Sequence, residues 1–136
     1  MVGYEGEKMS KSKGNLVLVS TLRREGADPA AIRAALLSRH YRSDWEWTEA
    51  SLSRAQERLD RWRAALDHEQ EDDAAGLLVS LHAALSDDLD APSALRELDE
   101  WAARALQRPA AARRDQQGLG ASCVVDALLG IRLTDA

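Results

Sequence analysis

The chain of 136 residues has no phenylalanine, one cysteine and three prolines, and aromatic residues make up only 4% of it. A single cysteine, Cys123, cannot form an internal disulfide, and its neighbours Val124 and Val125 predict a small buried side chain. No apolar run approaches the roughly 20 residues of a membrane-spanning helix, and residues 1–3 lack the charge of a signal peptide. We therefore expect a cytoplasmic protein without contact to a membrane, with a core of leucine, alanine and four tryptophans.

Positive charge is also scarce, because 18 lysines and arginines face 23 acidic residues and the formal net charge is −5. This deficit argues against a surface devoted to nucleic acid, which is bound by clustered positive charge. The exception is the segment through Arg24, where five basic residues against two acidic ones give +3. Any anion-binding function is therefore expected near this end of the chain.

Residues 7–15 read EKMSKSKGN and hold three lysines and two serines with no amphipathic period. Such a segment predicts an exposed loop. Lysine ammonium groups can follow phosphate oxygens, serine hydroxyls add donors, and Gly14 permits a close turn, so polyphosphate is a natural ligand. A solvated basic loop or a nucleic-acid patch fits the spacing equally well.

Residues 1–19 contain two apolar extended pieces, Met1–Tyr4 and Leu16–Val19, on either side of this loop. They predict a strand, a loop and a second strand edge, or a segment that pairs with another domain. Ser20 is expected to cap a short helix through Arg24, and Asp28-Pro29 to begin another that ends near His40. Asp44–Trp47 predicts a short extended connection with both indoles on one side.

The remainder predicts helices. Thr48, Asp73 and Asp90 are expected to begin three amphipathic helices, and residues 122–129 a short final one. Residues 108–120, rich in alanine, arginine and glycine, predict a flexible segment. The expected fold is mainly α, with a short N-terminal extended segment and loop before an antiparallel bundle of about four to five helices. The expected divisions are residues 1–19, 20–47 and 48–136.

Three segments carry a family resemblance. Lys8-Met9-Ser10-Lys11-Ser12 is identical to the KMSKS signature of class I aminoacyl-tRNA synthetases, and its flanks resemble the cysteinyl branch. The segments His40–Ser43 (HYRS) and Asp87–Leu95 (DDLDAPSAL) resemble segments of the same branch in the same order. Within that group, Asp44–Thr48 (DWEWT) is similar to the mycothiol-biosynthesis cysteine ligases. The resemblance would make this chain a C-terminal part of such an enzyme.

The resemblance implies an ATP-dependent reaction with Mg²⁺, in which cysteine becomes cysteinyl-adenylate and is transferred to the amine of glucosaminyl-inositol. Lys11 would contact the ATP phosphates and stabilise the departing pyrophosphate, with Lys8 assisting. Met9, Ser10 and Ser12 would complete the phosphate-binding loop. The backbone at Val2 would touch the adenine of the adenylate.

The partner implied is the N-terminal catalytic domain of the same enzyme, without which the chain is expected to be inactive. That domain would also supply the ligands of a Zn²⁺ ion for the cysteine thiolate. The chain itself predicts no metal site, since His40, His68 and His82 are widely spaced and no cysteine lies near them.

Two alternatives stay open. The chain could belong to a cysteinyl-tRNA synthetase with tRNA as its partner, although its short ending after Gly130 favours the ligase. It could also be a non-catalytic helical interaction module.

Several side chains have two interpretations. Asp87, Asp88 and Asp90 could supply a carboxylate acid/base pair or hold magnesium, but capping by Asp90 and solvation of the others are favoured. Trp45 and Trp47 could stack on a sugar or base, but packing against the bundle is favoured. The sequence leaves Arg42 undecided between an ion pair within the fold and a position in the cleft.

Overall fold

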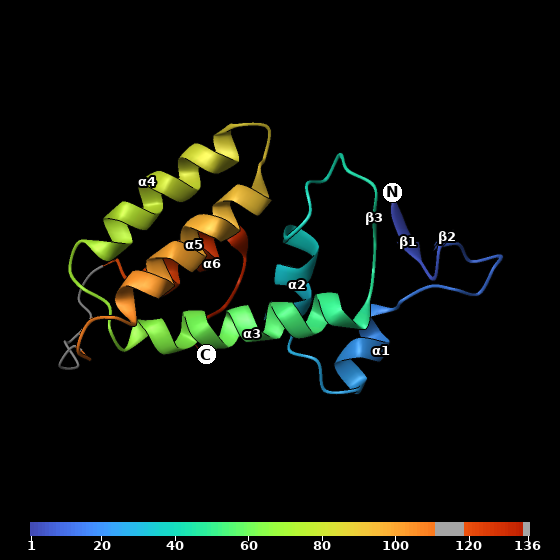
Figure 1. Cartoon of the computed structure of the whole chain (residues 1–136), viewed down its shortest axis with the longest axis horizontal. Coiled ribbons are helices and arrows are strands. Elements are labelled where there is room, and N and C mark those ends of the chain that lie inside the picture. The colour runs from blue at the N-terminus through green and yellow to red at the C-terminus, as the bar shows by residue number, and fades with distance from the viewer. Residues whose placement is uncertain (111–118, 135–136) are drawn as a thin grey trace.

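A computed structural model describes residues 1–110 and 119–134, which form six helices and a three-stranded sheet (Figure 1). The elements in chain order are β1 (Val2–Tyr4), β2 (Glu7–Lys8), α1 (Val19–Arg24), α2 (Pro29–Leu37), β3 (Trp45–Glu46), α3 (Glu49–Leu66), α4 (Asp73–Ser86), α5 (Ala91–Ala105) and α6 (Ala121–Leu129). The mainly α prediction is confirmed. Most of the segment expected to be flexible, residues 111–118, lies outside the described residues.

Side-chain caps begin three of the helices as predicted. The side chains of Asp28, Thr48 and Asp90 accept hydrogen bonds from backbone N–H groups two or three residues further on, at 2.8, 3.2 and 3.0 Å. The cap predicted at Ser20 is wrong. The carbonyl of Leu18 already accepts the first bond of α1, so the helix begins at Val19 without a side-chain cap.

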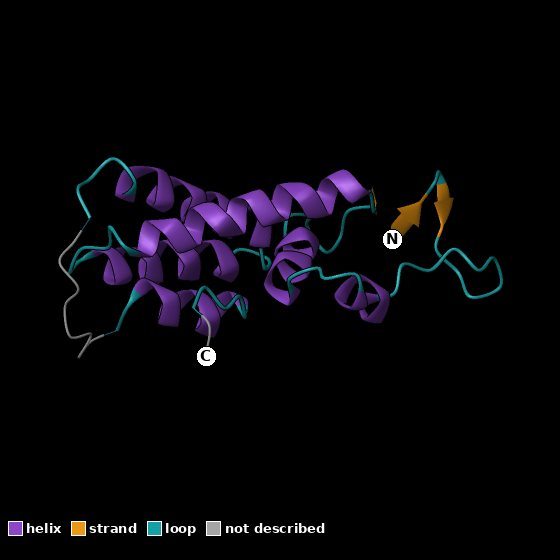
Figure 2. Cartoon of the chain, turned by 90° about the horizontal axis from the view of Figure 1, so that it is seen from below, coloured by secondary structure: helices purple, strands orange, loops and turns teal. Residues whose placement is uncertain are grey.

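The core lies between helices α2 to α6. Helices α4 and α5 run antiparallel, α3 packs against α5 and α2, and α6 packs against α4 (Figures 1 and 2). Trp62, Leu81 and Leu95 are among the fully buried side chains. Cys123, expected to be buried, is exposed, because α6 turns the two valines that follow it inward. One helical face cannot bury three successive residues, since each is rotated by about 100° from the last.

The small sheet has β1 in its centre. Strand β2 pairs with β1 antiparallel, and β3 pairs with it parallel in the register Val2 to Trp45. The first of the two alternatives for Leu16–Val19, a second strand edge, is wrong, because residues 15–18 form no strand and α1 begins at Val19. Glu5 and Gly6 both have positive φ, 52° and 77°, and reverse the chain before the lysine-rich loop, so β1 pairs with β2 and not with a segment beyond the loop.

Strand β3 joins the sheet to the bundle. The N–H of Trp45 donates to the Met1 carbonyl at 3.0 Å and that of Trp47 to the Gly3 carbonyl at 2.8 Å. The two indoles lie 6.0 Å apart, and Trp47 is buried in the core, which confirms the packing interpretation. Because α3 begins two residues later, the hairpin and loop are carried at the end of the molecule remote from α4 and α6 (Figures 1 and 2).

Candidate phosphate-binding loop

The loop at residues 9–18 leaves the sheet from the end of β2 and projects away from the bundle (Figure 2). Its first residue, Met9, is tied to β1, because its N–H donates to the Val2 carbonyl at 3.3 Å. The Met9 side chain is half-buried and packs against the core. The loop is therefore anchored at its start by backbone pairing and by an apolar side chain, while residues 11–14 face solvent.

One asparagine closes the loop. The side chain of Asn15 accepts a hydrogen bond from the Ser10 N–H at 2.9 Å and donates one to the Lys8 carbonyl at 3.2 Å. Within this closure, the Gly14 N–H donates to the Lys11 carbonyl at 3.2 Å, and Gly14 has a φ of 69°. Residues 10–15 are thus a closed turn whose shape depends on one amide and one glycine.

The three lysines of the loop differ in their partners. Lys13 pairs with Glu7 at 2.7 Å, whereas Lys8 and Lys11 have no ion pair within residues 1–110 and 119–134. All three are exposed. The lysine that Glu7 neutralises, Lys13, is the one to which the resemblance gave no role in phosphate binding. Two free ammonium groups are left to face a ligand.

The two serines of the loop lie on either side of Lys11 in the chain. The hydroxyl oxygens of Ser10 and Ser12 lie 3.3 Å apart, so the two groups share one hydrogen bond and retain further donor and acceptor capacity. Val2 lies half-buried in β1, directly beside the start of the loop. All six predicted site residues therefore occupy one hairpin and its loop. Sequence reasoning missed Asn15 and Glu7, and their spacing from the residues they contact gives no helical or strand period that could have revealed them.

A second cluster braces the connection between α2 and β3. Asp88 accepts a hydrogen bond from the Tyr41 hydroxyl at 2.8 Å and pairs with Arg42 at 3.0 Å and with His40 at 3.8 Å. The hydrogen bond to Asp88 raises the pKa of the Tyr41 phenol. Arg42 thus forms an ion pair within the fold. Asp88 is exposed to solvent as predicted, but it also has these three partners.

The turn that presents Asp88 has an unusual backbone. Asp88 and Leu89 both have positive φ, 52° and 55°, which non-glycine residues adopt at a cost. Asp90, next in the chain, caps α5 through Ser93, and those hydrogen bonds lower the pKa of the Asp90 carboxyl. The two segments singled out in the sequence, at residues 40–43 and 87–95, therefore meet in space.

The described residues contain no group of three or more histidine, cysteine, aspartate or glutamate side chains able to hold a metal ion. The zinc ion that the resemblance implies would be held by the N-terminal catalytic domain. None of the helices in residues 1–110 and 119–134 has the length and apolarity to cross a lipid bilayer.

Comparison with known proteins identifies the class. Residues 1–57, from β1 into α3, match the family described as tRNA synthetases class I (C) catalytic domain. This range contains the hairpin, the lysine-rich loop and the connection braced by Asp88. This part of the chain is similar to the catalytic domains of class I tRNA synthetases.

Curated relatives narrow this further. The chain is 59% identical over 134 residues to the L-cysteine:1D-myo-inositol 2-amino-2-deoxy-alpha-D-glucopyranoside ligase of Streptomyces griseus, and 52% identical over 133 residues to that of Paenarthrobacter aurescens. The ligase of Streptomyces coelicolor is 55% identical over 133 residues. Each alignment covers 98% of the chain but only 31–32% of the relative. The chain spans about a third of the length of these relatives, and the resemblance to the cysteine ligases of mycothiol biosynthesis is confirmed.

Proposed function

We propose that this chain is the phosphate-binding and helical part of an ATP-dependent ligase that joins cysteine to the amine of glucosaminyl-inositol. The observation that carries the proposal is the closed loop with two unpaired lysines, in a chain 52–59% identical to ligases of that name. In this proposal residues 1–19 complete a nucleotide-binding domain, residues 20–47 connect it to the bundle, and residues 48–136 form the bundle. The remaining catalytic domain is the partner.

The first step would be activation of cysteine. A carboxylate oxygen of cysteine attacks the α-phosphorus of ATP, the bond to the bridging oxygen breaks, and pyrophosphate leaves with the electron pair. Negative charge grows on the departing pyrophosphate during this step. Lys11, assisted by Lys8, stabilises that charge with a positive charge that is in place before the reaction begins. Such preorganised electrostatic stabilisation is usually the largest single contribution to catalysis. Ser10 and Ser12 add donors, and the Val2 backbone borders the adenine.

The second step would transfer the cysteinyl group. The amine of glucosaminyl-inositol attacks the carbonyl of cysteinyl-adenylate, loses a proton, and AMP leaves. Magnesium would accompany the ATP phosphates. Zinc would bind the cysteine thiolate in the remaining domain, and no step is assigned to this chain through it.

The matching family description names tRNA synthetases, so tRNA is a second candidate acceptor. A complete enzyme incubated with cysteine and ATP, and separately with glucosaminyl-inositol or tRNA, distinguishes the two by which acceptor becomes cysteinylated. Formation of neither product contradicts both functions.

Substitution of Lys11 tests the phosphate role. In the complete enzyme, Lys11→Ala should lower the rate of ATP–pyrophosphate exchange by about 100- to 1,000-fold, the usual effect of removing one preorganised group that stabilises developing charge. Circular dichroism should be unchanged, because the side chain is exposed.

Lys13→Ala is the matched control. It removes the same charge from the same loop, but Lys13 is paired with Glu7 and such exposed pairs contribute at most about 1 kcal/mol, so the exchange rate should fall by less than about tenfold. Equal losses in the two variants would contradict the assignment of separate roles to these lysines.

A further inference from the structure

A cavity of about 200 Å³ lies between the end of α2 and the first turns of α3, on the bundle side of β3. Its lining residues are Ser38, Arg39, Ser51, Arg54, Ala55 and Arg58. Three of these six carry guanidinium groups, two carry hydroxyl groups, and none is acidic. At roughly 30 Å³ for each water molecule, the cavity has room for several waters or for one small polar ligand.

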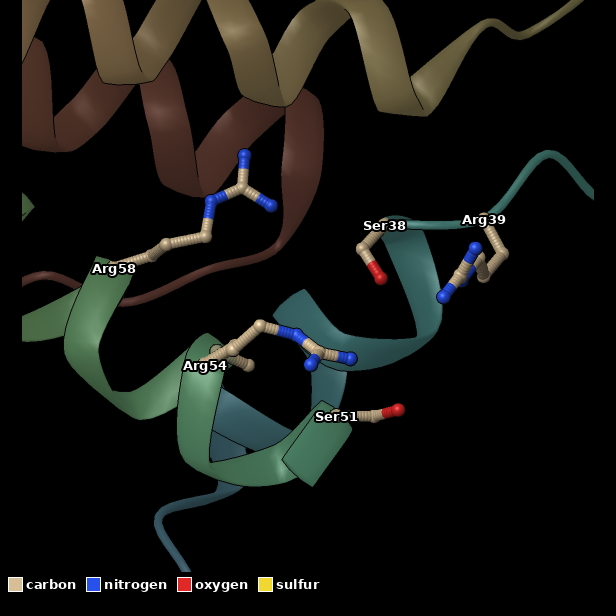
Figure 3. Close-up of a pocket in the computed structure, with 6 residues that line it drawn as sticks. Ser38, Arg39, Ser51, Arg54 and Arg58 are labelled. Carbon is tan, nitrogen blue, oxygen red and sulfur yellow. The ribbon is translucent and has the colours of Figure 1, made fainter. Parts of the chain in front are cut away.

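Among residues 1–110 and 119–134, only one of these three guanidinium groups, that of Arg58, has hydrogen-bond partners. Arg58 donates to Asp99 at 2.8 and 3.1 Å and to the Leu95 carbonyl at 3.0 Å, and its guanidinium also lies over the Trp62 ring at 5.2 Å. Figure 3 shows this guanidinium turned away from the cavity. Arg58 therefore belongs to the core contacts between α3 and α5.

Arg39 and Arg54 are different. Both are exposed, and neither guanidinium group has a hydrogen bond or an ion pair in the part of the chain that the structure describes. In Figure 3 the side chain of Arg39, which follows the end of α2, and that of Arg54, which lies on α3, extend toward one another. Two like charges that converge on a cavity without an acidic residue repel each other, and an anion between them would remove that repulsion.

The hydroxyls at the cavity are placed by the ends of the two helices. Ser51 is buried, and its oxygen lies 2.9 Å from that of Thr48, the residue that caps α3. Ser38 donates to the Ala35 carbonyl at 2.6 Å and keeps its lone pairs free. The positive end of the α3 dipole adds to the field of the arginines. The ligand favoured is an oxyanion, since a planar guanidinium matches its geometry with two parallel hydrogen bonds.

We propose that Arg39 and Arg54 form a binding site for a phosphate group, free or as a small monoester, distinct from the lysine-rich loop. The sites share no residue: this one stands on α2 and α3, and the loop is carried by β1 and β2. The site therefore does not depend on the proposed ligase function. A ligand there would bridge the two helices and hold the segment that leads into β3.

Calorimetric titration of the full 136-residue chain with inorganic phosphate, and with glucose 6-phosphate, tests this site. Sodium chloride at matched ionic strength is the blank. Arg39→Gln and Arg54→Gln should each weaken phosphate binding at least tenfold, and the double variant should abolish it. Arg61→Gln, an exposed arginine on the same helix outside the cavity, should leave affinity unchanged. Tighter binding of the sugar phosphate identifies a monoester as the ligand, and tighter binding of inorganic phosphate identifies the free ion.

The double variant Lys8→Ala/Lys11→Ala separates this site from the loop, because it should leave phosphate binding to the arginines intact. Loss of binding in that variant, with full binding in Arg39→Gln/Arg54→Gln, would place the anion on the loop and overturn the proposal. Absence of phosphate binding at millimolar concentrations would also overturn it. A thermal melt of each variant checks that the fold is retained.

Discussion

Asn15 offers a test of the loop that does not touch its charges. Asn15→Ala removes the side chain that accepts from the Ser10 N–H and donates to the Lys8 carbonyl, and leaves every lysine in place. The closed turn loses its two internal ties, so it samples open conformations in which Lys8 and Lys11 no longer face the same ligand. In the proposed enzyme this should slow adenylate formation without changing the fold of the bundle.

The size of the effect follows from the two hydrogen bonds. Each contributes about 0.5–1.5 kcal/mol net, so together they favour the closed loop by about 1–3 kcal/mol. Because about 1.4 kcal/mol corresponds to a factor of ten in rate, the exchange of pyrophosphate into ATP should slow roughly 5- to 150-fold. This is smaller than the loss expected for Lys11→Ala, since Asn15 acts only by positioning.

Two measurements distinguish positioning from a direct role. Hydrogen exchange of the Ser10 N–H should accelerate in Asn15→Ala, but Asn15→Asp should keep it slow, because the carboxylate still accepts that bond. Asn15→Asp loses only the hydrogen bond donated to the Lys8 carbonyl. Its rate of ATP–pyrophosphate exchange should therefore lie between those of the wild type and Asn15→Ala. An Asn15→Ala enzyme with wild-type rate and unprotected Ser10 would refute the view that loop closure matters.

Two further predictions concern stability. Asp99→Ala should lower the free energy of unfolding by about 2–3 kcal/mol and Tm by roughly 10 °C, because Asp99 accepts from Arg58 and from the Trp62 indole N–H at 2.8 Å. Glu100→Ala next to it, which loses only an exposed pair at 3.7 Å, should change Tm little, and equal shifts would contradict this account. Burial raises the pKa of the Glu69 carboxyl above 4.5, so its stabilising contribution is complete below pH 4.5 and is lost as the pH rises through the raised pKa. In urea unfolding, the free energy of unfolding of Glu69→Gln minus that of the wild type should therefore be larger at pH 7 than at pH 4. The same difference at both pH values would contradict this account.

Local chemistry made the helical part of this fold predictable. Asp28, Thr48 and Asp90 begin helices because each side chain satisfies a backbone N–H a few residues away, a contact that needs no distant partner. The apolar period then fixes which face is buried. Two predictions made from immediate neighbours failed: α1 begins at Val19, before the predicted cap Ser20, and the phase of α6 leaves Cys123 exposed.

The loop illustrates the limit of that reasoning. Its residue types indicated an anion and its five-residue signature indicated a family, and both came from the sequence alone. Only the fold shows which lysines lack an ion pair among the described residues, because in the folded chain Glu7 pairs with Lys13. The pairing of Asp88 with Tyr41 and Arg42 joins residues more than 40 positions apart. The parallel pairing of β3 with β1 likewise joins residues 43 positions apart, and its register depends on where the bundle places Trp45. Short-range hydrogen bonds and apolar periodicity can be predicted from neighbouring residues. Ion pairs and cavities depend on which distant segments the packed helices bring together.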